Sequence, residues 1–309
     1  MQRRLTDYLI ISLKGLAMGA ADVVPGVSGG TIAFISGIYE ELITTINNVN
    51  FDLLKTFFKQ GFKAGWKQLN GNFLLALFLG IGFSILTLAK GLKWLLENEP
   101  ILLWSFFFGL VLASIFFVGK QITKWNIWIV LGLIIGAFVA FYITTLPSMA
   151  VNSSSWFLFF AGALAICAMI LPGISGAFIL VLLGAYSPVL DAINARDIKT
   201  LAILACGAVV GILSFSKLLK WLFKYYHNLT LALLTGFIFG SLNKIWPWKK
   251  TITTRLNSKG IEVPVIEESI SPFTFEGDPK IGFAIGLMII GFLTILVLEK
   301  LGSRNRKQL

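Results

Sequence analysis

The sequence predicts an all-α polytopic membrane protein made of two inverted repeats, each containing one re-entrant helical hairpin and three transmembrane helices. Three observations support this fold class. The 309 residues are 56% hydrophobic and only 13% charged, far from the composition of a soluble domain. A hydrophobic segment interrupted by a PGVSGGT turn recurs 147 residues later in the chain. The basic residues, which give a formal net charge of +11, gather in short loops between apolar segments.

The interrupted segment covers residues 13–43, and its second copy covers residues 160–190. In each copy the proline ends the preceding helix, and the following serine is a good N-cap for a new one. The arms 8–23 and 28–43 have 16 residues each and reach about 24 Å, short of the ~30 Å hydrocarbon core. We therefore predict re-entrant hairpins at 8–43 and 156–190. The identical pairs are Gly15/Gly162, Ala21/Ala168, Pro25/Pro172, Gly26/Gly173, Ser28/Ser175, Gly29/Gly176, Ile32/Ile179, Gly37/Gly184 and Tyr39/Tyr186.

Six further apolar stretches predict full membrane spans, three after each hairpin. A second self-similarity, at a shift of 127 residues, relates the spans of the two halves. We accordingly divide the chain into repeat one, residues 1–146, and the inverted repeat two, residues 147–309. The predicted spans are about 73–89, 101–119 and 125–146 in the first repeat and 200–216, 229–246 and 281–298 in the second.

Two segments lie outside the membrane spans. Residues 47–70 carry lysines on one helical stripe and aromatic or aliphatic residues on the other, which predicts a basic amphipathic helix in the membrane interface. Residues 248–280 form the longest loop, and the stretches TITTRL and IEVPVI within it predict a small β-hairpin.

The distribution of Lys and Arg predicts the topology. If both hairpins return to the side from which they enter, one side receives 15 basic residues and the short loops of the other side receive four. The positive-inside rule then places both termini in the cytoplasm of a multi-pass protein of the cell (inner) membrane. Each half contains an odd number of crossings, so the halves are inverted, as in many secondary transporters.

Two helix N-termini, capped by Ser28 and Ser175, predict a shared site for one compact anion near the midplane. Amides at the start of a helix lack partners and favour negative charge. The alternative is that the glycines only permit close helix packing and the Pro-Gly pair only turns the chain. The predicted binding residues are Pro25, Gly26, Ser28, Gly29, Gly30 and Thr31 in the first hairpin and Pro172, Gly173, Ser175, Gly176 and Ala177 in the second.

Asp22 is the only acid deep in a hairpin, and its counterpart in the second copy is Met169. An acid beside an anion site repels the anion unless the acid is protonated or paired. Three roles remain open: a proton-coupling residue, a partner of Lys14, or a cap for backbone amides at the break.

Four lysines, Lys90 and Lys93 with their counterparts Lys217 and Lys220, lie near opposite membrane interfaces. Anchoring at the interface is their ordinary role. As a hypothesis, they also gather lipid phosphate headgroups from each leaflet.

The residues predict no cofactor, no metal and no nucleic-acid partner. Cys167 and Cys206 lie within apolar segments, and no nucleotide-binding loop is present. The expected partners are the lipid bilayer and a membrane-borne or dissolved anion, and the sequence leaves a homo-oligomer open.

At the two interrupted segments the sequence resembles the polyprenyl-phosphate transporter (PopT) family of prokaryotic membrane proteins. The stretches that carry the resemblance are GxxMGxADVVPGVSGGTIAFxxGIYExLI and LPGISGAFILxLLGAY, and the likeness covers nearly the whole chain. It implies a transporter, or flippase, that returns undecaprenyl phosphate from the outer to the inner leaflet for cell-wall biogenesis. Alternating exposure of the two hairpins, driven or not by protons or other ions, is the implied mechanism.

Two other classes of function remain as alternatives. Membrane-embedded polyprenyl-pyrophosphate phosphatases have a similar P-G-x-S turn, but with an Arg after the Ser and paired Glu residues. Neither hairpin here contains Arg, and hydrolysis needs a nucleophile, an acid and cationic charge on the phosphates. The sequence therefore predicts that the chain is not an enzyme. An ion-coupled transporter of a small anionic solute is the second alternative.

Overall fold

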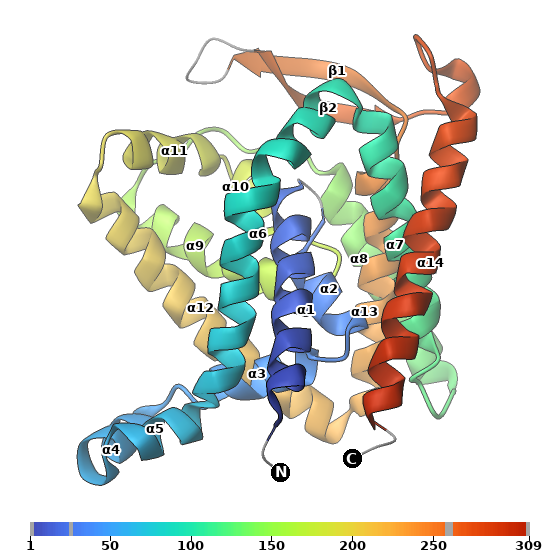
Figure 1. The fold of residues 1–309 in the computed structure, drawn as a ribbon. Helices are drawn as coiled ribbons and strands as arrows, with labels where there is room; N and C mark the ends of the chain where they lie inside the picture. The colour runs from blue at the N-terminus through green and yellow to red at the C-terminus, as the bar shows by residue number, and fades with distance from the viewer. Residues whose placement is uncertain (1–2, 25–26, 257–261, 307–309) are drawn as a thin grey trace.

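A computed structural model describes residues 3–24, 27–256 and 262–306. Its long helices and one small β-hairpin are arranged as shown in Figure 1. The helices of the first half are α1 (Leu5–Val23), α2 (Gly29–Ile35), α3 (Tyr39–Asn47), α4 (Phe51–Gln60), α5 (Phe62–Leu69), α6 (Gly71–Asn98), α7 (Pro100–Gly119) and α8 (Ile127–Thr145). Those of the second half are α9 (Ser155–Ile170), α10 (Gly176–Leu182), α11 (Tyr186–Asn194), α12 (Ile198–Tyr225), α13 (His227–Ser241) with the 3-10 turn η1 (Leu242–Ile245), and α14 (Ile281–Arg306).

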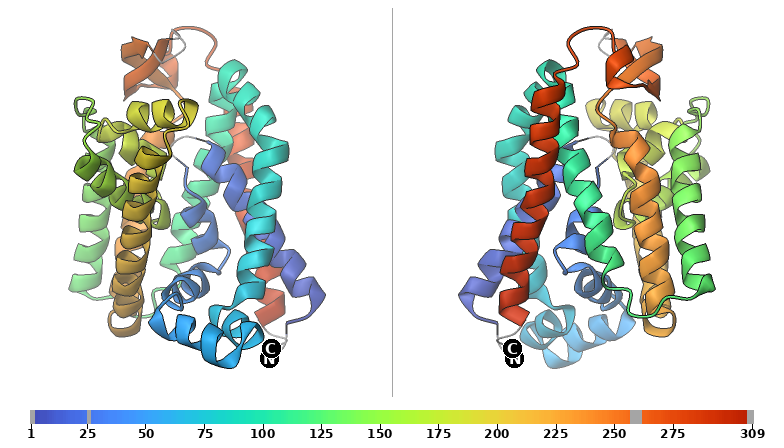
Figure 2. Two further views of the ribbon diagram at one scale, coloured as in Figure 1. Left: turned by 90° about the vertical axis from the view of Figure 1, so that its left-hand side faces the viewer. Right: turned by 90° about the vertical axis from the view of Figure 1, so that its right-hand side faces the viewer.

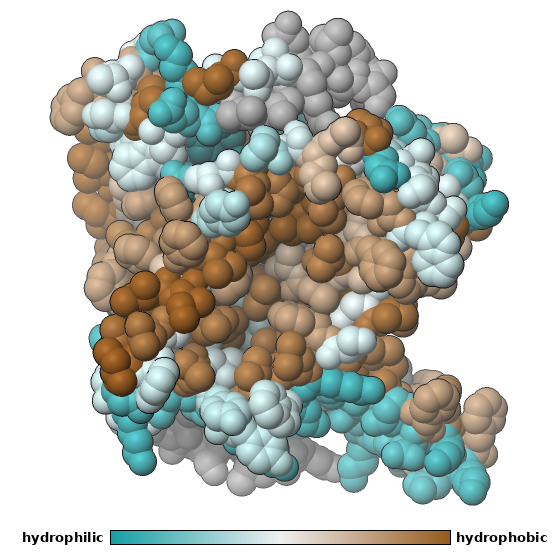
Figure 3. All heavy atoms as spheres, turned by 180° about the vertical axis from the view of Figure 1, so that it is seen from behind, coloured by the Kyte–Doolittle hydropathy of each residue, from teal (hydrophilic) through white to brown (hydrophobic). Residues whose placement is uncertain are grey.

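All six predicted spans are helical, so the prediction of an all-helical membrane protein is confirmed. Within the described residues, α6, α7, α8 and α12 are each long and apolar enough to cross a membrane, and the bent pair α10 and α11 adds a fifth candidate. The other two, α13 and α14, are apolar but shorter, since the apolar part of α14 is Ile281–Val297. Figure 3 shows the apolar side chains as a band across the molecule, with hydrophilic residues above and below it.

The elements related by the sequence repeat have matching bounds. At a shift of 147 residues, α2 and α3 coincide with α10 and α11, and at a shift of 127 residues α6 coincides with α12. Their close contacts also correspond. An added Cβ at Gly80 of α6 would collide with the Ser12 carbonyl of α1, and one at the equivalent Gly207 of α12 would collide with the Phe159 carbonyl of α9. Small residues at these points let the helix backbones approach closely.

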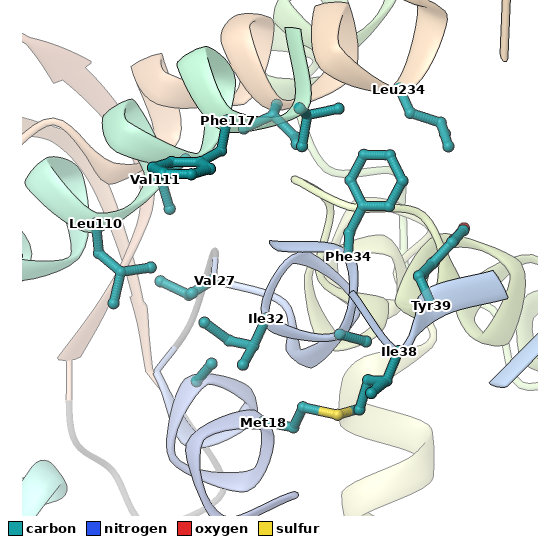
Figure 4. Packing of buried hydrophobic residues seen from close by; sticks show 14 of the residues in the cluster. Met18, Val27, Ile32, Phe34, Ile38, Tyr39, Leu110, Val111, Phe117 and Leu234 are labelled. Atoms are coloured by element: carbon teal, nitrogen blue, oxygen red, sulfur yellow. The ribbon is translucent and has the colours of Figure 1, made fainter. Parts of the chain in front are cut away.

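The long helices form two groups, which Figure 2 shows side by side. One group contains α1, α6, α7 and α14, and the other contains α8, α9, α12 and α13. The helix α2 packs between them, against α7 and α9, so the break of the first hairpin lies inside the bundle. Figure 4 shows Ile32 and Val27 beside Leu110 of α7, while Phe34 and Tyr39 lie together on the side of Leu234.

The stretch 47–70, expected to be one amphipathic helix, consists instead of the two helices α4 and α5. They meet at Gly61, whose φ of +83° ends the first helix and redirects the chain. Phe51, Phe58 and Phe62 remain largely exposed, as a surface that contacts lipid requires. In Figure 1 this pair extends from the bundle at the end where α1 begins and α14 finishes.

The β-hairpin predicted in the long loop is confirmed. Strand β1 (Lys249–Leu256) pairs antiparallel with β2 (Glu262–Ser269), and the pair lies at the opposite end of the bundle from the start of α1. Two tryptophans attach the loop, because Trp246 Nε1 donates to the Ile270 carbonyl at 2.8 Å and Trp248 Nε1 donates to the Pro279 carbonyl at 2.9 Å.

Candidate functional site

The first interrupted segment breaks between the end of α1 at Val23 and the start of α2 at Gly29. Pro25 and Gly26, both predicted binding residues, lie outside the described residues. Ser28 is the N-cap of α2, as predicted, since its hydroxyl accepts from Gly30 N at 3.1 Å. Gly29 to Phe34 of α2 are buried, so this break is enclosed by the bundle.

Asp22 supplies a second cap to the same helix. Its Oδ1 accepts from Gly29 N at 2.7 Å, which is the capping role among the three that the sequence leaves open. Lys14 Nζ donates to the Ser36 carbonyl at 2.7 Å, at the far end of α2. The expectation that the first amides of α2 await an external anion therefore needs correction, because Asp22 and Ser28 already accept from Gly29 and Gly30.

The second hairpin is built differently at its break. Gly173 adopts φ +92°, and Pro172, Gly173 and Gly176 are buried. Ser175 occupies the N-cap position of α10, yet its side chain makes no capping hydrogen bond. Among the described residues the Ser175 hydroxyl has no hydrogen-bond partner, although the residue is only 9% exposed. The residue after Gly176, Ala177, is exposed, so this break is more open than the first.

The two breaks are in direct contact. Gly173 N donates to Thr31 Oγ1 at 2.8 Å, and Ser28 Oγ donates to the Met169 carbonyl at 3.1 Å. Gly30 packs on the same segment, because an added Cβ there would lie 2.7 Å from the carbonyl oxygens of both Met169 and Ile170. Thr31 is the residue that the sequence singles out as an extra hydroxyl in the first copy, and the structure gives it a partner in the second hairpin.

We expect the change Thr31→Val to weaken this contact. Valine keeps the shape but removes the acceptor, so the buried Gly173 amide loses its partner at a cost of about 1–3 kcal/mol. Thermal unfolding in detergent measures the loss, and Thr31→Ser, which keeps the hydroxyl, is the matched control. Equal unfolding temperatures for the Val and Ser variants would contradict the assigned role of the hydroxyl.

The four lysines predicted to gather headgroups lie away from the breaks. Lys90, Lys93, Lys217 and Lys220 are exposed in the last turns of α6 and α12. Lys93 lies 3.7 Å from Glu97, one turn along its own helix. Their exposure suits interfacial anchoring.

A different pair of cations, which the sequence analysis did not identify, lies near the second hairpin. Lys244 Nζ is 5.0 Å from the ring centroid of Phe178, the third residue of α10. The neighbouring cation is Lys249, at the start of β1. Nearly seventy residues separate these lysines from the hairpin, so only the fold brings them together. The cluster WPWKK, rich in aromatic and basic residues, is the local signal that points to them.

Comparison with known proteins places the chain in a family. The model of a family described as undecaprenyl phosphate translocase-like matches residues 18–263. The chain is 47% identical over 308 residues to the polyprenyl-phosphate transporter of Vibrio cholerae serotype O1, covering 98% of this chain and 100% of the relative. It is 28% identical over 311 residues to the polyprenyl-phosphate transporter of Staphylococcus aureus, covering 95% and 96% of the two chains.

No solved structure matches the chain. Both relatives are named transporters, in agreement with the prediction that this chain is not an enzyme. The match extends through both interrupted segments, whose breaks lie in contact at the centre of the fold. The chain therefore belongs to the undecaprenyl phosphate translocase-like family of membrane proteins.

Proposed function

We propose that the protein transports undecaprenyl or a related polyprenyl phosphate between the leaflets of the cell membrane, returning the carrier from the outer to the inner leaflet. The observation that carries the proposal is the contact between two interrupted helices in the middle of an apolar bundle. Irregular backbone at membrane depth persists where it is buried in protein or lines a cavity, and in transporters it binds the substrate. The names of the relatives supply the substrate class.

The proposed topology has two inverted repeats, with re-entrant hairpins and cytoplasmic termini. Three observations support it. The helix α6 rises from the end where α1 begins, whereas its counterpart α12 runs the other way (Figure 1). The bent pair α10 and α11 turns by 108° and does not continue straight across the bundle. The basic helices α4 and α5 lie at the same end as the start of α1, the end that the positive-inside rule assigns to the cytoplasm.

The proposed transport cycle uses the asymmetry of the two breaks. Here α2 is enclosed, while in α10, all of it within the described part of the chain, Gly176 alone is buried. This conformation therefore suits access from the side of the β-hairpin, with Ser175 and Ala177 facing an incoming phosphate. Access from the other side requires the contacts of Ser28 with Met169 and of Thr31 with Gly173 to separate.

A lipid substrate fits the surface better than a dissolved anion. Two hollows on the described surface are lined almost entirely by apolar residues, one of about 330 Å³ between α1 and α6 and one of about 560 Å³ between α8 and α13. Grooves of this kind accept a hydrocarbon chain, while a solute transporter needs a vestibule open to water. This favours the lipid over the small-solute alternative.

The test is transport of labelled undecaprenyl phosphate between the leaflets of proteoliposomes, with and without a proton gradient. We expect wild-type protein to accelerate transfer and Ser175→Ala to weaken substrate binding by about 1–3 kcal/mol, the value of a hydrogen bond to a charged group. Ser154→Ala is the matched control, because Ser154 lies exposed at the start of α9 in the same hairpin. Failure of the wild-type protein to accelerate transfer would refute the proposed function.

A further inference from the structure

Two lysines and one glutamate form a compact charged cluster beside the second hairpin. Lys244 Nζ and Lys249 Nζ each lie 3.6 Å from the same oxygen, Glu267 Oε2. Lys249 Nζ also donates to the Lys244 carbonyl at 2.8 Å, which fixes the two residues together. One carboxylate therefore faces two ammonium groups, and the cluster carries a net positive charge.

This charge is largely shielded from solvent. Only 11% of the Lys249 side chain is exposed, and 25% of each of the Lys244 and Glu267 side chains. Burial lowers the pKa of Lys249 from 10.5 to about 8; Glu267 opposes this shift and Lys244 adds to it. A desolvated cation with half a counter-ion is costly, and an added anion would compensate it.

Aromatic rings place the cluster between the β-hairpin and the second break. The Lys249 ammonium lies 4.4 Å from the centroid of the Trp104 ring on α7, and the Lys244 ammonium lies over Phe178 of α10. Phe178 follows Ser175 by three residues, which is about 4.5 Å along a helix. The cations are thus within reach of the break that the transport proposal regards as open.

We propose that Lys244 and Lys249 form an anion site for a phosphate monoester, occupied before the phosphate reaches the break at Ser175. The inference rests on the proposed function and adds the positive charge that neither hairpin contains. Glu267 holds the two lysines in place when the site is empty, and the phosphate competes with this carboxylate for them. The groove between α8 and α13 ends at Asn243, next to Lys244, and so offers an adjacent path for a lipid chain.

Binding to wild-type protein and three variants in nanodiscs tests the site, with undecaprenyl phosphate as one probe and inorganic phosphate as the other. We expect Lys244→Gln/Lys249→Met to lower the affinity at least tenfold, because both cations are lost while methionine keeps the apolar stem of Lys249 against Trp104. We expect Glu267→Gln to raise the affinity about threefold, because the competing carboxylate is gone. Lys250→Gln is the matched control, since Lys250 is the next residue of β1, is exposed and pairs with Glu276.

The sign of the Glu267→Gln effect separates an anion site from a purely structural ion pair. A structural pair predicts that Glu267→Gln and the double lysine variant both lower the unfolding temperature and leave binding unchanged, and that result would overturn the inference. Equal loss of binding in Lys250→Gln would overturn it as well. A response of the lipid probe alone assigns the site to a headgroup, and a response to inorganic phosphate assigns it to free phosphate; both support the anion site.

Proton uptake gives an independent readout at this site. A bound phosphate raises the pKa of Lys249, whose facing charged groups are Lys244 and Glu267, so binding at pH 8 to 9 takes up protons. Calorimetry in buffers of different ionisation enthalpy measures this uptake, and its absence would remove Lys249 from the site. If wild-type protein binds the probes in this way but transports no lipid, the proposed function fails while the anion site stands. If transport is normal in the double lysine variant, only the anion site fails.

Discussion

Gly30→Ala is expected to reduce lipid transport to the background rate of empty vesicles. The new Cβ would lie 2.7 Å from the carbonyl oxygens of Met169 and Ile170, and both are backbone atoms that cannot rotate away. The two hairpins must therefore separate at the point where they exchange hydrogen bonds, and the overpacking costs about 1–3 kcal/mol. Because alanine is the smallest possible side chain, the effect reports this contact alone.

The matched control for this change is Gly82→Ala. Gly82 lies within α6, and an added Cβ at that position meets no atom within 4 Å. Transport is measured in proteoliposomes, and unfolding in detergent shows whether each variant is folded. A folded Gly30→Ala protein with wild-type transport would show that close approach of the two breaks is dispensable, and would remove the main support for a shared site.

The architecture could be predicted because the sequence repeats itself. Helix-breaking residues mark where α1 and α9 end, and the serine that follows marks the start of α2 and α10. The same pattern placed the β-hairpin between prolines and glycine. The division of residues 51–69 into α4 and α5 could not be predicted, because the stripe of lysines has the same period in one helix or two. It is the positive φ of Gly61 that separates them.

The candidate site could be predicted in composition but not in its pairing. The turn residues indicated where amides would be free, yet Asp22 and Ser28 accept from the amides of α2. Whether a carboxylate repels an anion or caps a helix depends on a rotamer and a distance, which spacing along the chain does not give. The contribution of Lys244 and Lys249 depends on packing between distant segments, so only the fold reveals it.

We expect Asp22→Asn to leave the fold intact and to abolish the response of transport to a proton gradient. Asparagine has an oxygen that accepts from Gly29 N as Asp22 Oδ1 does, so the cap of α2 is retained. It cannot gain or lose a proton, so any coupling that passes through this position stops. Asp22→Ala removes the acceptor as well, and we expect it to lose about 1–3 kcal/mol of stability in addition.

Glu40→Gln is the matched control, since Glu40 belongs to the same hairpin but is exposed in the first turn of α3. Transport is compared with and without the gradient for each variant, and unfolding in detergent separates stability from coupling. If Asp22→Asn keeps the response to the gradient, the carboxylate serves only as a cap and another group carries the proton. If the response is lost in Asp22→Asn and kept in Glu40→Gln, the same carboxylate links proton movement to the contact between the hairpins, because its cap on Gly29 adjoins the Gly30 contact with Met169.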